Sequence, residues 1–121
     1  MLNFGYMNLL KICMIDDEGA MLQAGKDQVL LPRRELTEEL RPGAMLEAFV
    51  YADREGHAVA TLCQPKATVG EFALMRVKQI NDHGAFMDWG ISKDLLVPLK
   101  EQAEPMKIGH HYLVKVRLDR E

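Results

Sequence analysis

The sequence has 121 residues, of which 48% are apolar and 27% are charged. This composition excludes a disordered chain, and the length allows one ordinary domain or two very small ones. The net charge of −3 argues against a non-specific nucleic-acid binder, and no apolar run is as long as a membrane-spanning helix, which needs about 20 residues.

The first fifteen residues are mostly apolar but do not have the pattern of a secretory signal. They lack a basic start and a small-residue cleavage site, and Asp16, Asp17 and Glu18 follow directly. The two cysteines, Cys13 and Cys63, have neither paired nor metal-binding spacing, which is typical of a reducing compartment. The sequence also contains no familiar catalytic motif. We therefore expect a soluble cytoplasmic protein that is not an enzyme and holds no cofactor or metal.

Short alternating apolar runs predict five strands in the first half of the chain. These strands are expected over residues 8–15, 19–24, 28–32, 46–52 and 57–63. Gly19 opens the second strand, and Pro32, which cannot donate a hydrogen bond to a ladder, ends the third. A polar connector at residues 33–40 follows and is a candidate for a short helical turn.

The second half of the chain repeats the first, which indicates tandem domains. Residues 4–25 align with 69–90 at an offset of 65, so that three glycines of each segment coincide. After one extra residue in the second copy the offset is 66, and Asp-Arg-Glu at 53–55 lies over the same tripeptide at 119–121. The sequence thus predicts one unit at residues 1–65 and a second at residues 66–121. The segment around their boundary, residues 64–70, is a predicted linker with little to bury.

The second copy has the predicted strands of the first except for the last one. These strands are expected over residues 73–80, 84–89, 94–98 and 112–118, with a polar connector at 99–106. In the fourth strand, Tyr112, Val114, Val116 and Leu118 alternate onto one predicted core face. The sequence reaches Glu121 where the turn into a fifth strand would begin. Either the chain is a fragment of a longer protein, which we favour, or another segment supplies the strand. We expect these residues alone to self-associate, to swap strands or to be unstable.

The fourth strand of the first copy places two aromatic residues unexpectedly. The register of the repeat gives this strand a core face that consists of Leu46, Ala48, Val50 and Ala52. Phe49 and Tyr51 then point outward, which leaves two interpretations open. Either the rings are buried against the neighbouring repeat, or they form a surface that docks a partner.

The string GAFMDWGISKDLLVP at residues 84–98, with PKATVGEFA at 65–73, carries a family resemblance. The GAF start of the second strand and the glycines that flank strands 1 and 4 resemble the S-1 RNA-binding domain, a five-stranded OB-fold barrel. The longer string is more similar to the conserved virulence factor B family of bacterial S-1-like RNA-binding proteins, in which several such domains precede a winged-helix domain. The resemblance implies an all-β fold of two tandem five-stranded OB-fold barrels, the second lacking its last strand.

For such a barrel we expect single-stranded RNA on the outer face of strands 2 and 3, held by aromatic stacking and by basic side chains that contact phosphates. His83 and Phe86 match the two stacking positions of the family pattern, Asp119 matches its aspartate after strand 4, and Pro98 replaces its histidine. The candidate RNA-binding residues are Phe72, Lys78, His83, Phe86, Trp89, Lys93, Lys100 and Asp119.

The aromatic residues and the lysines of this set also have a structural alternative. Phe86 and Trp89 could fill the core, Phe72 could lie in the core or at its rim, and the lysines could belong to an ordinary solvated surface. In the first copy the stacking positions hold Glu18 and Met21, so we expect that unit to bind RNA poorly.

A second function remains open from the sequence. The protein could be an interaction module that docks a partner protein or further domains through its outer strand faces, including Phe49 and Tyr51. The negative net charge suits this hypothesis better than it suits RNA binding, and an OB fold accommodates many kinds of ligand.

Overall fold

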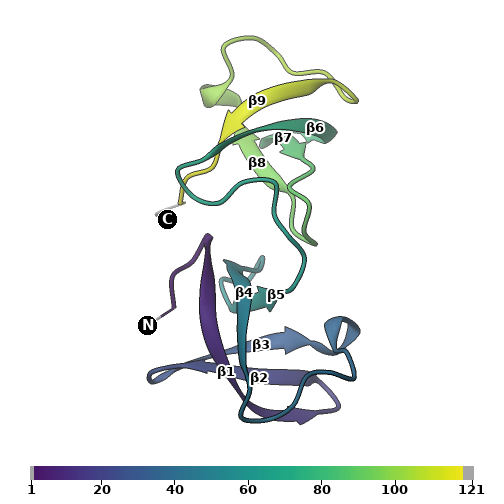
Figure 1. Ribbon diagram of the computed structural model, residues 1–121. Helices are drawn as coiled ribbons and strands as arrows, with labels where there is room; N and C mark the ends of the chain where they lie inside the picture. Colours follow the sequence, from purple (N-terminus) through teal and green to yellow (C-terminus); the bar gives the residue numbers. More distant parts are fainter. Residues whose placement is uncertain (1, 119–121) are drawn as a thin grey trace. The chain divides into compact units, whose positions relative to one another are not determined.

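The computed structural model describes residues 2–118, and in these residues the regular structure consists of strands and two short 3-10 turns. The chain divides into two compact units between Gln64 and Pro65, one residue before the predicted boundary. Each unit begins with one long, alternating strand that takes part in two ladders (Figure 1).

The first unit is a closed barrel with the strand order β1-β2-β3-β5-β4. Its strands are β1 (Tyr6–Asp16), β2 (Gly19–Ala24), β3 (Asp27–Pro32), β4 (Met45–Ala52) and β5 (Ala58–Thr61), with the turn η1 (Arg33–Glu35) after β3. β5 closes the barrel because it runs antiparallel to β4 and parallel to β3. Alternate positions of all five strands face inward and form an apolar core, which includes Leu10, Ile12, Leu22, Leu31 and Val50.

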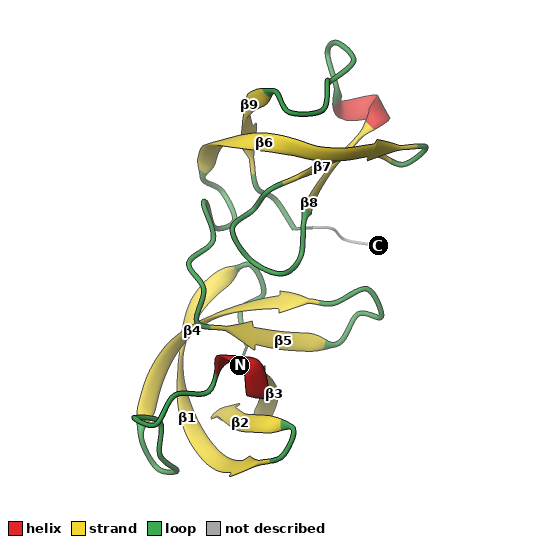
Figure 2. Cartoon of the chain, turned by 90° about the vertical axis from the view of Figure 1, so that its right-hand side faces the viewer, coloured by secondary structure: helices red, strands yellow, loops and turns green. Residues whose placement is uncertain are grey.

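The second unit is an open sheet with the strand order β8-β7-β6-β9 (Figure 2). Its strands are β6 (Phe72–Asn81), β7 (Gly84–Met87), β8 (Leu95–Pro98) and β9 (His111–Lys115), with η2 (Leu99–Glu101) after β8. Met75, Val77, Ala85, Met87 and Val116 are buried on its inner face. β6, β7, β8 and β9 correspond to β1, β2, β3 and β4 of the first unit, and the described residues contain no equivalent of β5.

The long first strand of each unit carries a β-bulge. The ladder register shifts between Ile12 and Met14 in β1 and between Val77 and Gln79 in β6, which leaves Cys13 and Lys78 as the extra residues. These two residues are equivalent in the repeat, at the offset of 65. A bulge bends and twists its strand, so that one strand can pair with β2 or β7 at one end and with β4 or β9 at the other.

The second strand of each unit, β2 or β7, starts with a glycine for a steric reason. Gly19 and Gly84 have φ values of +143° and +141°, and a Cβ atom would lie 2.1 Å from the Leu31 carbonyl oxygen or 2.2 Å from that of Val97. Because both contacts are with the backbone of the neighbouring strand, no other residue fits without moving the ladder.

The aromatic residues of β4 are buried. Phe49 has 0% and Tyr51 has 6% of its surface exposed, and the two rings stack with centroids 6.2 Å apart. Burial of large rings removes much apolar surface from water, which stabilises this arrangement. The hypothesis that Phe49 and Tyr51 form an accessible docking surface is therefore wrong for this structure.

Candidate functional site

The outer face of β7 and β8 carries an aromatic ring that lies between one polar and one apolar side chain of the neighbouring strands. Ala85 and Met87 face the core, so Phe86 between them points to the opposite side, where it is half-buried. In the ladders Phe86 pairs with Gln79 of β6 and with the exposed Leu96 of β8. Of the two positions that the sequence left open for Phe86, the structure shows the outer surface of strands 2 and 3 of its unit and not the core.

The bulge in β6 places two polar side chains opposite Phe86. In a β-bulge the extra residue and its successor oppose a single residue of the partner strand. Lys78 and Gln79 therefore both lie across from Phe86. Without the bulge, strict alternation would place only one of these two side chains on the outer face.

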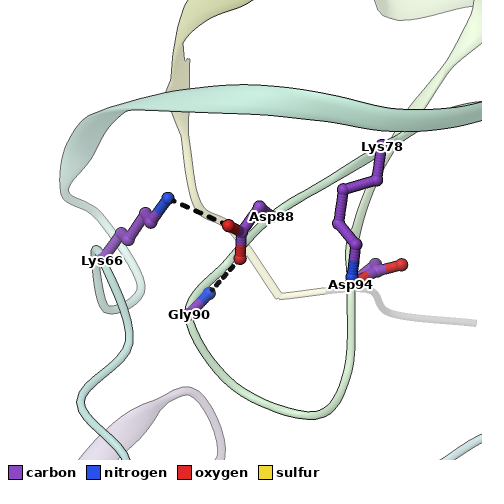
Figure 3. A network of polar contacts seen from close by, with 5 residues as sticks. All are labelled: Lys66, Lys78, Asp88, Gly90 and Asp94. Atoms are coloured by element: carbon purple, nitrogen blue, oxygen red, sulfur yellow. Dashed lines mark hydrogen bonds and ion pairs between the residues drawn. The ribbon is translucent and has the colours of Figure 1, made fainter. Parts of the chain in front are cut away.

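Two carboxylates neutralise two lysines around the face (Figure 3). Lys78 Nζ lies 3.0 Å from Asp94 Oδ1, and Lys66 Nζ lies 3.3 Å from Asp88 Oδ2. The Gly90 N–H donates to the other oxygen of Asp88 over 3.0 Å. Partial burial raises the pKa of Asp88, but the Gly90 and Lys66 hydrogen bonds and the charges of Lys66 and Lys78 lower it, so that its pKa lies below the ordinary value. The local charge is therefore nearly balanced, and an anion has to compete with these pairs.

The remaining predicted residues of this region lie in the connections of the hairpin. His83 is exposed in the β6–β7 turn, where its N–H donates to Asn81 Oδ1 over 2.8 Å. Lys93 is exposed in the loop before β8, and Lys100 is exposed on η2. Lys78, His83, Phe86, Lys93 and Lys100 thus all lie in the part of the second unit that runs from β6 through β7 and β8 to η2.

The fold does not bring Phe72 to this face. Phe72 is 62% exposed at the start of β6, where it pairs with Lys115 of β9. Seven residues separate Phe72 from Gln79 along the strand, which corresponds to roughly 20 Å. Phe72 belongs instead to the outer face of β6 and β9.

Trp89 is part of the packing of the second unit and is not a surface platform. It is 6% exposed, and its Nε1–H donates to the Ala67 carbonyl oxygen over 2.8 Å. The Lys66 N–H donates to the Trp89 carbonyl oxygen over 2.7 Å. A ring enclosed in this way cannot stack a base, so the assignment of Trp89 as an RNA contact is wrong. The expectation of an unpacked linker is also wrong, since Ala67 is only 3% exposed.

The last predicted contact, and the first unit's equivalents of His83 and Phe86, complete the comparison with the sequence. Asp119 lies outside the described residues. In the first unit Glu18 is exposed and Met21 is half-buried at the positions that correspond to His83 and Phe86. That unit therefore offers no aromatic ring at either position.

Sequence reasoning missed the acidic side of this site. The pairs that Asp88 and Asp94 form with Lys66 and Lys78 join segments 22 and 16 residues apart, and no local pattern indicates them. The burial of Trp89, in contrast, had a signal: it shares the alternation of Ala85 and Met87, which face the core. Within residues 2–118 there is no cluster of metal-ligating side chains and no helix long and apolar enough to cross a membrane.

Comparisons with known proteins agree with this fold. Residues 4–63 match the S1 domain family model. The uncharacterized protein YitL of Bacillus subtilis is 35% identical over 82 residues, which cover 67% of this chain and 28% of YitL. Conserved virulence factor B of Staphylococcus aureus strain MW2 is 31% identical over 88 residues, with 69% and 29% coverage. The corresponding protein of Staphylococcus haemolyticus is 26% identical over 124 residues, with 97% and 42% coverage.

A solved structure has the same fold at low sequence identity. A multidomain protein with nucleic acid binding domains from Streptococcus pneumoniae TIGR4 superposes with a TM-score of 0.82 at 22% identity. The match covers 97% of this chain and 42% of that protein. The chain thus spans less than half the length of each of these relatives.

The barrel and the family model together define an S1-domain protein. The chain belongs to the conserved virulence factor B family of S1-like bacterial proteins. The family resemblance read from residues 65–98, and with it the all-β tandem-barrel fold, is confirmed.

Proposed function

We propose that this protein is a non-catalytic, regulatory RNA-binding module of the cytoplasm, and that its second unit holds single-stranded RNA. Membership of the S1 family supports nucleic-acid binding, as does the fold shared with a protein that has nucleic acid binding domains. The observation that carries the proposal is Phe86, which lies on the outer face of β7 with Lys78 beside it.

Each group of the face has a role in this proposal. The ring of Phe86 stacks one base, a contact worth roughly 1–3 kcal/mol. The side chain of Gln79 reads a base edge, and Leu96 extends the apolar floor. Lys78, Lys93, Lys100 and the turn residue His83 contact the phosphates.

The acidic partners set the strength of binding. A phosphate that approaches Lys78 has to displace or share the Asp94 carboxylate, which lies 3.0 Å from the ammonium group. Removal of that carboxylate in Asp94→Asn is therefore expected to strengthen binding at low salt, because it leaves one more uncompensated positive charge.

Binding of a fluorescent oligouridine to the 121-residue chain, measured by anisotropy at several salt concentrations, tests the proposal. Phe86→Ala should weaken binding by about fivefold to a hundredfold, which corresponds to one lost stacking contact. Phe72→Ala removes the same kind of side chain from the outer face of β6 and β9 and should change the affinity for RNA little. Met21→Ala, at the equivalent position of the first unit, is a second control.

Two results would contradict the proposal. One is an affinity that does not fall with salt, because phosphate contacts release counterions. The other is an equal loss of RNA affinity in Phe86→Ala and Phe72→Ala, since this would show that the affinity does not depend specifically on the β7–β8 face.

A further inference from the structure

The outer face of β6 and β9 combines exposed apolar side chains with cations. Three cross-strand pairs point outward here: Phe72 with Lys115, Leu74 with Leu113, and Arg76 with His111. Phe72, Leu74 and Leu113 are 62%, 60% and 68% exposed. A contiguous exposed apolar patch with a polar rim is typical of a surface that binds another protein.

The cations of this face have no acidic partner in the described part of the chain. Lys66, Lys78 and Arg117 of the same unit are paired with Asp88, Asp94 and Glu101. Arg76 and Lys115, in contrast, form no ion pair within residues 2–118, and Lys115 Nζ lies 5.6 Å from the centroid of the Phe72 ring. None of the six outward residues is acidic. Within residues 2–118, Arg76 and Lys115 are therefore available to carboxylates of another molecule.

The first unit lacks this combination at the equivalent positions. Leu9 and Leu74 are similarly exposed, and each has a cation two residues further on, Lys11 or Arg76. Across the ladder, however, Leu9 pairs with Glu47, whereas Leu74 pairs with Leu113. Phe49, the counterpart of Lys115, is buried. The repeat itself therefore does not require the apolar and cationic face of the second unit.

We propose that the β6–β9 face is a docking surface for a protein segment that carries apolar side chains flanked by carboxylates. The apolar groups of the partner cover Leu74, Leu113 and Phe72, and its carboxylates pair with Arg76 and Lys115. A single-stranded nucleic acid fits this face less well, because two of its three apolar side chains are leucines, which have no flat ring for a base to stack on. Its apolar side chains belong to the β6–β9 ladder, whereas Phe86 pairs with Gln79 of β6 and Leu96 of β8.

The test uses the 121-residue chain and two designed helical peptides. Both peptides have leucines on one face; glutamates flank the leucines in one and lysines flank them in the other. We expect the glutamate peptide to bind and to shift the NMR signals of Leu74 and Leu113, with weaker binding at high salt. Leu74→Ser with Leu113→Ser should weaken binding at least about tenfold.

Charge reversal makes the test specific. Arg76→Glu with Lys115→Glu should lose the glutamate peptide and gain the lysine peptide. The matched control, Leu9→Ser with Lys11→Glu, alters the equivalent positions of the first unit and should leave binding unchanged. All these side chains are exposed, and the fluorescence of Trp89, the single tryptophan, verifies that each variant keeps the second unit folded.

The proposal is overturned if neither peptide binds, if both bind the wild-type chain equally, or if the variants of the β6–β9 face bind as the wild type does. It is also overturned if oligouridine binding depends on Arg76 and Lys115 while peptide binding does not. Because Phe86→Ala leaves this face intact, failure of the RNA proposal would not remove peptide binding.

Discussion

Gly84 occupies the same place in the second unit as Gly19 in the first, and both combine a positive φ with a close approach to the next strand. At Gly84, with φ +141°, an added Cβ would lie 2.2 Å from the Val97 carbonyl oxygen and 2.9 Å from Pro98 Cα. Neither contact is with a flexible side chain that could move aside. The glycine therefore determines how β7 leaves its turn and pairs with β8.

We predict that Gly84→Ala lowers the free energy of unfolding of the second unit by more than the ~1–3 kcal/mol of backbone strain, because the β7–β8 ladder must also shift. Urea unfolding followed by Trp89 fluorescence measures this loss. Gly109→Ala is the matched control: φ is +85° there, and an added Cβ would meet nothing within 4 Å. Equal losses in the two variants would show that the approach to Val97 has no cost.

At the scale of the strand, alternation predicted most of the elements but not their irregularities. The strand expected at 19–24 is β2 (Gly19–Ala24), and the one expected at 73–80 lies within β6 (Phe72–Asn81). The bulges at Cys13 and Lys78 were not predicted, because these residues alternate as any others would. Pairing partners decide where a ladder gains an extra residue, and a single strand's pattern does not contain them.

The same limit explains which parts of the site could be predicted. The outward position of Phe86 follows from the alternation of Ala85 and Met87, and the same alternation would have placed Trp89 inside. The separation of Phe72 from Phe86 and the pairing of Lys66 with Asp88 depend on tertiary structure. Residue types alone therefore identified candidates without grouping them into faces.

The segment that follows β7 should make the second unit sensitive to acid. Although partial burial raises the pKa of Asp88, the Gly90 and Lys66 hydrogen bonds lower it below its ordinary value of 3.8. A carboxyl group whose pKa is lower in the folded state stabilises the fold above its unfolded pKa and loses this contribution as the pH falls through the folded value. We expect the stability of the second unit to fall below about pH 4 and Asp88→Asn to reduce this dependence.

Urea unfolding monitored by Trp89 fluorescence, at neutral pH and at about pH 3, measures this pH dependence of the free energy of unfolding. The wild type and Asp88→Asn should differ most at neutral pH and converge in acid. A constant difference across this range would mean that the ionised form of Asp88 has no special role in stability.

At the scale of the whole molecule, the two units differ in closure. In the first unit β5 pairs with both β3 and β4, and Glu35 of η1 accepts hydrogen bonds from Thr61 Oγ1 and the Leu62 N–H. Glu101, the equivalent of Glu35, instead pairs with Arg117 over 2.7 Å. Leu118, predicted to lie in the core, is 49% exposed. Within residues 2–118, β8 and β9 each have one paired edge and one unpaired edge.

We predict that a protein of these 121 residues associates with itself as its concentration rises, because unpaired strand edges pair with other chains. Analytical ultracentrifugation over a range of concentrations detects the oligomer. A synthetic peptide of residues 57–63, which contain β5, should compete for the free edges and shift the distribution toward monomer. A chain that stays monomeric, with a second unit as stable as the first, would contradict this prediction.

The bulge has a consequence for how the two halves diverged. The same backbone irregularity holds a thiol at Cys13 in one copy and an ammonium group at Lys78 in the other. Since the irregularity persists while its side chain changes, the curvature of the first strand requires it and the chemistry of that side chain does not. This position is therefore one at which selection, or an engineer, can exchange chemistry freely on an unchanged scaffold.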